Sequence, residues 1–198
     1  MNMRRVEHKA EFDRILTDAR MCVYIDSRRA PTPLHLMVFD DGMLCADYFF
    51  AALRDLIEQS ADPGAYFLVL EPDPVDNFHR LYGRYPVVEI GREDSSEAYL
   101  GAMNEDVGDG QGFSLGNLCL TWVIVPPSNK WFIHAIRSAY DDSGHLWVPP
   151  EWVDKLLAAH PGVFRDVPAS LREGRADTSG ETCPAVPWSR SLAAPNRR

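Results

Sequence analysis

A pentapeptide of the type G-x-S-x-G is the motif in this sequence that most resembles a catalytic one. It reads Gly112-Phe113-Ser114-Leu115-Gly116. In hydrolases with this pattern, the serine stands on a sharp turn between an entering strand and a leaving helix. Here a glycine-rich loop enters and an apolar, strand-like segment leaves, so the context is inverted. A small hydrolase using Ser114, with His145 or His160 as its base, therefore remains an alternative interpretation.

The histidines and cysteines do not show metal-ligand spacing. No two histidines are four residues apart, and the sequence contains no C-x-x-C pair and no His/Cys zinc pattern. Residues 106–110 are rich in carboxylates and glycine but lack the ligand ladder of a calcium loop. We therefore predict no metal and no cofactor. Cys22 or Cys119 beside a histidine would form a thiol site if the fold brought them together, so a Cys/His pair is the second form of the hydrolase alternative.

The overall charge limits the classes of partner. Twenty Lys and Arg residues against 29 Asp and Glu residues give a formal charge of −9 at pH 7. A net-negative surface disfavours broad contact with nucleic-acid phosphates or anionic lipid, and no P-loop or dinucleotide fingerprint is present. The longest apolar run, 118–125, is too short to cross a bilayer. We predict neither a nucleic-acid nor a membrane partner. With no signal-peptide pattern and no secreted disulfide pattern, we expect a cytoplasmic protein.

The negative charge is concentrated in the middle of the chain. Residues 31–112 hold sixteen acidic and four basic residues, and residues 93–109 hold six acidic residues with no Lys or Arg. Like charges held close together repel one another, and a cationic partner relieves that repulsion and is steered in faster. We interpret this segment as a docking surface for a basic protein, and the alternative is an ordinary solvated surface. Its candidate partner-binding residues are Glu93, Asp94, Glu97, Glu105, Asp106 and Asp109.

Four tryptophans fall within residues 122–152, a density that suits either a packed core or an interface. Aromatic side chains dominate core burial, and they are also enriched among the residues that anchor protein interfaces. The tip of an expected hairpin and the segment 144–149 are the places where one or two of them would be exposed. Trp131 and Trp147 are the candidate anchors.

Periodic apolar patterns predict alternating helices and strands. The β-type patterns include an antiparallel hairpin, 117–125 with 131–140, joined by the loop 126–130. The expected helices cover 6–20, 47–60, 75–82, 95–103 and 152–160, and the expected strands cover 21–26, 33–39, 66–70, 86–90, 117–125 and 131–140. Together they predict an α+β fold: a mostly antiparallel sheet of about five to six strands with helices packed on it.

The composition changes near the end of the chain. Residues 165–198 are rich in proline, serine and threonine and have few grouped apolar residues. We therefore expect one α+β domain over residues 1–164, followed by a disordered tail over residues 165–198.

Three features together resemble bacterial immunity proteins of polymorphic-toxin systems. They are the small acidic α+β body, the hairpin segment with Trp131-Phe132-Ile133-His134-Ala135-Ile136, and the aromatic stretch that follows to Trp152. The resemblance covers roughly residues 117–160 and concerns the class rather than one family. It implies a non-enzymatic protein that binds and neutralises one cognate toxin.

These observations favour a non-catalytic protein-binding module in the cytoplasm. The expected function is that of an immunity protein or inhibitor whose acidic face engages a basic toxin domain. Besides the hydrolase, a structural or regulatory subunit of a bacterial complex is the remaining alternative. Neither the partner nor the oligomeric state is specified by these patterns.

Overall fold

The fold was analysed on a computed structural model, which describes residues 3–24, 34–71, 75–105, 121–136 and 143–167. Within these ranges the helices and strands alternate along the chain. The helices are α1 (Lys9–Tyr24), α2 (Asp47–Ser60), α3 (Val75–Tyr82), α4 (Ser96–Asn104) and α6 (Val153–Ala159), with 3-10 turns η1 (Asp41–Cys45) and η2 (Pro150–Trp152). The strands are β1 (His35–Asp40), β2 (Gly64–Glu71), β3 (Val87–Gly91), β4 (Thr121–Val125), β5 (Phe132–Ile136), β6 (Ser143–Val148) and β7 (Arg165–Asp166).

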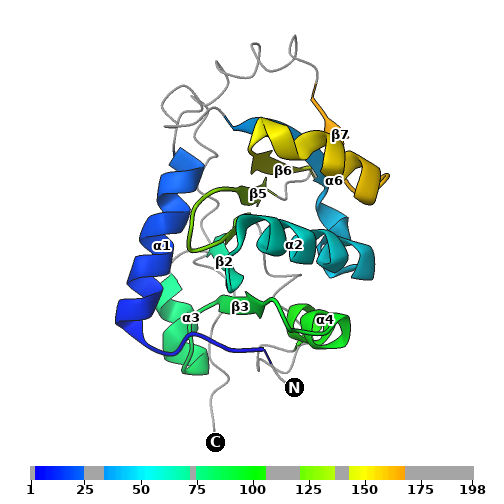
Figure 1. Cartoon of the computed structure of the whole chain (residues 1–198). Coiled ribbons are helices and arrows are strands. Elements are labelled where there is room, and N and C mark those ends of the chain that lie inside the picture. The colour runs from blue at the N-terminus through cyan, green and yellow to red at the C-terminus, as the bar shows by residue number, and fades with distance from the viewer. Residues whose placement is uncertain (1–2, 25–33, 72–74, 106–120, 137–142, 168–198) are drawn as a thin grey trace, which may run out of the picture. The chain divides into compact units, whose positions relative to one another are not determined.

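The strands form one sheet in the order β3-β2-β4-β5-β6-β1-β7, and every pairing in it is antiparallel (Figure 1). This confirms the predicted α+β class. The sheet is wider than expected because β6 and the short β7 are strands as well. β6 pairs on one side with β5 and on the other with β1, and β7 pairs with β1 at the edge of the sheet. Gly144 and two polar neighbours in β6 weaken the strand pattern, which is why the sequence did not indicate it.

The predicted hairpin is present over residues 121–136, and its loop is anchored; residues 117–120 and 137–140 of the prediction lie outside the described residues. Ile124 pairs with Ile133, and Trp122 pairs with Ala135. The side chain of Asp62, which is 5% exposed, accepts hydrogen bonds from the Ser128 amide at 3.0 Å and from its hydroxyl at 2.6 Å. A buried carboxylate thus fixes the loop through charge-assisted hydrogen bonds.

Alternating side chains give the sheet two buried faces. On one face, Phe67 and Trp122 belong to the larger core, which α2, α4 and α6 help to build. On the other face, Leu68 and Val123 pack in a second core with residues of α1. Figure 1 shows α6, α2 and α4 following one another on one side, with α1 on the opposite side. Because both faces of β2 are covered, its continuous apolar run is that of an internal strand, as predicted.

The prediction of a strand over residues 21–26 is wrong, since α1 continues to Tyr24. Its buried residues Ile15, Ala19 and Cys22 extend one helical stripe, with spacings of four and three residues. The aromatic and β-branched types in Cys22–Ile25 favour a strand locally, but packing against the second core overrides that preference.

The compact unit ends at Val167, three residues beyond the expected boundary at 164. β7 pairs with β1, and Phe164 and Val167 on either side of it are buried. Residues 168–198, most of the expected tail, lie outside the described residues.

Candidate functional site: the acidic helical layer

The helices α2 and α4 are held side by side by buried aromatic contacts. Phe50 of α2 stacks on Tyr99 of α4 with 4.9 Å between ring centroids. The Tyr99 hydroxyl donates to the carbonyl of Leu44 at 2.6 Å, which ties α4 to η1 as well. The first turn of α4 is capped, because the Ser95 hydroxyl accepts from the Ala98 amide at 3.1 Å. The surface between these two helices is therefore fixed by the core beneath it.

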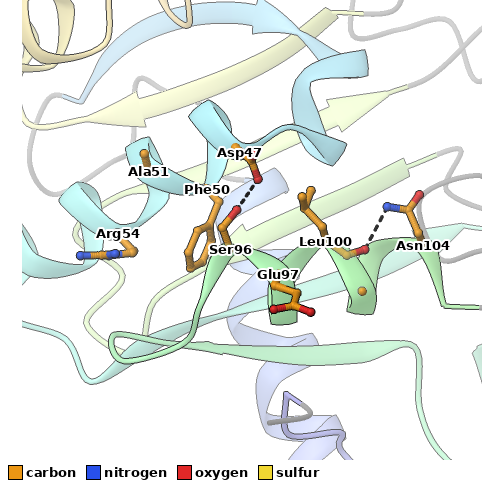
Figure 2. Close-up of a pocket in the computed structure, with 9 residues that line it drawn as sticks. Asp47, Phe50, Ala51, Arg54, Ser96, Glu97, Leu100 and Asn104 are labelled. Atoms are coloured by element: carbon orange, nitrogen blue, oxygen red, sulfur yellow. Dashed lines mark hydrogen bonds between the residues drawn. The ribbon is translucent and has the colours of Figure 1, made fainter.

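An open groove of about 820 Å³ runs between α2 and α4. Figure 2 shows how the two helices supply its opposite sides, with the Ser96 hydroxyl bonded to the Asp47 carboxylate across it. Its middle is apolar, with Phe50, Ala51 and Leu100, and charged groups lie at its rim. We call it the α2–α4 groove, lined by Asp47, Phe50, Ala51, Arg54, Ser96, Glu97, Leu100, Gly101 and Asn104.

One position in the α2–α4 groove lacks a side chain where there is room for one. Gly101 lies inside α4 and is exposed, and an added Cβ would meet no atom within 4 Å. Glycine inside a helix costs about 1 kcal/mol relative to alanine. No close contact among the described residues requires this glycine.

Acidic residues outnumber basic ones on α2 and α4, whereas α6 carries one of each, Asp154 and Lys155. α2 carries three acidic residues and one basic residue, whereas α1 on the other side carries three of each. We define the acidic helical layer by the exposed carboxylates on α2, on the α4 helix with its preceding turn, and on η2 with α6. These are Asp47, Glu58, Glu93, Glu97, Glu151 and Asp154.

The predicted acidic residues have different surroundings. Glu93 and Glu97 are exposed and form no ion pair within the described part of the chain. Asp94 instead accepts from the Gly91 amide at 2.6 Å and so fixes the turn before α4. Glu105 is bound by the guanidinium groups of Arg5 and Arg84, which neutralise it. Asp106 and Asp109 lie outside the described residues.

The predicted aromatic anchors do not lie on this layer. Trp131 is 0% exposed, and its indole N–H donates to the Ser60 hydroxyl at 3.2 Å, so it is a core residue rather than an anchor. Trp147 is half-buried and stacks on Phe132 in the core on the opposite side of the sheet. The exposed aromatic of the acidic helical layer is Tyr48, 53% exposed on α2. Its position beside the buried pair Phe49 and Phe50 was the sequence signal that we missed.

Ser114 and Cys119, two of the candidate nucleophiles of the hydrolase alternative, lie outside the described residues. Burial and the nearby Asp18 raise the pKa of Cys22 to about 11, so its thiol stays protonated at neutral pH and is a poor nucleophile. His160 is bonded to Asp55 at 2.8 Å, and His145 faces His134 across two paired strands. Among the described residues, no three His, Cys, Asp or Glu side chains are grouped so as to hold a metal ion.

No helix in the described ranges combines the length and the apolar character needed to span a bilayer. Comparison of the chain with protein-family models, curated proteins and solved structures finds no match.

Proposed function

We propose that this protein is a non-catalytic protein-binding module of the cytoplasm, an immunity protein or inhibitor that neutralises a basic toxin domain. The observation that carries the proposal is the acidic helical layer with an apolar groove inside it. Interfaces of this kind combine an apolar centre with a polar rim, and the rim charges steer the partner and set its orientation.

The charge distribution supports a directed interaction rather than uniform solubility. In α1 the acidic residues are balanced by neighbours one turn away, as in the pairs Lys9–Asp13 and Arg14–Asp18. Glu93 and Glu97 lack such neighbours among the described residues. A carboxylate without a neighbouring cation attracts an approaching cation more strongly than a carboxylate in an ion pair does.

The mechanism follows from the chemistry of a basic toxin that acts on phosphates. Such a toxin needs a cationic active site, and carboxylates presented on a rigid surface occupy that site in place of the substrate's phosphates. Because α2 and α4 are fixed from below by Phe50 and Tyr99, the backbone that carries the carboxylates needs no rearrangement on binding, which lowers the entropic cost of association.

Growth protection tests this function. The chain is co-expressed with a basic nuclease-toxin domain, taken first from the genes that flank its own, and cell growth is measured. The native chain should restore growth, and the double variant Glu93→Lys/Glu97→Lys should not. The charge-matched control is the double variant Glu7→Lys/Asp13→Lys, because both residues are exposed and lie outside the acidic helical layer. Equal protection by the native chain and the double variant would show that this surface is not the binding site.

A further inference from the structure

We infer that the α2–α4 groove receives an amphipathic α-helix of the basic partner, with the apolar stripe of that helix against Ala51 and Leu100 and its Lys or Arg residues beside Asp47 and Glu97. The inference rests on the proposed function and adds the form of the partner segment that this surface recognises.

The shape of the groove favours a helix over other ligands. A small molecule is normally enclosed on most of its surface, whereas this groove is open to solvent. An added β-strand requires a free sheet edge, and both walls of the groove are helices. A helix lying between two helices buries an apolar stripe without leaving backbone groups unpaired, because its own hydrogen bonds are internal.

The charges of the groove determine which kind of helix fits. Asp47 and Glu97 lie at its rim, and the net charge of α2 and the net charge of α4 are both negative. Arg54 is the single cation of the lining, and it lies one turn from Glu58, 4.0 Å away. A helix with an acidic flank would be repelled here, and one with a basic flank would be attracted.

Gly101 gives a steric reason for the same conclusion. The distance between packed helices depends on the side chains at their contact, and a glycine there allows the closest approach. Because nothing occupies the space in front of Gly101, a partner backbone has room to come close. The helix-destabilising residue is then explained by the ligand rather than by the fold.

The direct test uses a synthetic peptide of about 15 residues, near the minimum length for a helix in water. It carries leucines at helical spacing on one face and lysines on the flanks. A scrambled peptide of the same composition is the control for non-specific attraction to an acidic protein. Binding to the full chain is measured by fluorescence titration, and the site is mapped by amide chemical shifts. We expect the amphipathic peptide to shift resonances of α2 and α4 and to bind at least about tenfold more tightly than the scrambled one.

Two tryptophan substitutions make the test specific. Gly101→Trp places a bulky side chain at the groove, and its Cβ meets no atom within 4 Å. Circular dichroism and thermal unfolding of the variant check that it folds like the native chain. We expect it to weaken peptide binding by about tenfold or more. Ala158→Trp places the same side chain at an exposed site of α6 and should change the affinity by less than about twofold. Unchanged binding by Gly101→Trp, or equal binding of the two peptides, would overturn the inference.

The same variants separate this inference from the proposed function. In the growth assay, loss of protection in both Gly101→Trp and Glu93→Lys/Glu97→Lys supports both proposals. Loss in the charge-reversed variant alone would mean that the surface is used without the groove, and the helix inference would fail. Full protection by both variants would refute the two proposals together.

Discussion

Burial determines which aromatic residues of this protein a partner can reach. Trp131 is fully buried and hydrogen-bonded to Ser60, whereas Tyr48 on the same side of the sheet is 53% exposed. Exposed aromatic side chains are frequent anchors of interfaces, and buried ones contribute through the core. The two residues should therefore respond differently to substitution.

Trp131→Phe should destabilise the fold without changing partner affinity. The substitution removes the indole N–H that donates to Ser60 and leaves a small cavity, so we expect the free energy of unfolding to fall by about 2 kcal/mol. Urea denaturation followed by fluorescence measures this change. Tyr48→Ala is the matched control, with little effect on unfolding and a measurable loss of affinity. The reverse pattern would place Trp131 in the interface.

His134 should make the folded state less stable in acid. Burial, and to a smaller extent the facing His145, lower the pKa of His134 to about 4, against an ordinary value near 6.5. Between those values the unfolded chain binds a proton that the folded chain does not, so stability falls as the pH decreases. We expect His134 to account for about 2 kcal/mol of the stability lost between pH 7 and pH 4.5.

Urea titrations at several pH values test the role of His134, with His134→Gln as the reference that lacks the titrating ring. The variant should lose less stability than the native chain over this range. Parallel curves for the two proteins would contradict the assignment.

The helices and strands that were predicted correctly from the sequence are those whose positions depend on local apolar periodicity. Helix α2 begins and ends where its apolar stripe does, and the hairpin follows from two apolar runs and a short polar loop. The end of α1 and the strand β6 were missed because packing partners distant in sequence determine them.

The residues of the candidate site also include some that the sequence predicted and others that only the fold explains. Glu93 and Glu97 were predicted from charge density alone. The neutralisation of Glu105 by Arg5, a residue 100 positions away, depends on the fold and has no local signal. Gly101 likewise has no signal in the sequence. Only the structure shows that the space in front of it is empty, which makes it a candidate contact position for a partner.

Gly101→Ala should stabilise the protein. The position is an exposed helix interior with free space, so alanine should add about 0.5–1 kcal/mol to the free energy of unfolding. Gly144→Ala is the opposite case, because its Cβ would lie 2.1 Å from the Phe39 ring. That ring is packed against Phe49 and Trp122 and has no room to move, so the melting temperature should drop. Thermal unfolding measures both changes, and a destabilised Gly101→Ala variant would mean that the helix needs this glycine.

In the whole molecule, the sheet lies between α1 on one face and the helices α2, α4 and α6 on the other, and the two faces differ in their charge. In α1, Asp13 and Asp18 each pair with a cation one turn away, and on the other side of the sheet Glu58 pairs with Arg54 in the same way. Glu93 and Glu97, by contrast, form no ion pair among the described residues. A basic partner is then oriented before contact, because the field differs between the two sides. This asymmetry is the physical basis of the proposed inhibitory role.

The most direct test of that role is the rate of association with a basic nuclease-toxin domain, taken first from the genes that flank that of this chain. The rate is measured by stopped-flow fluorescence over a range of ionic strength. The account predicts a rate that falls steeply with added salt, because salt screens exposed charges. It also predicts that Glu97→Lys slows association at low salt while Glu7→Lys leaves it nearly unchanged. A rate that is independent of salt, or one that Glu97→Lys and Glu7→Lys reduce equally, would contradict the central claim.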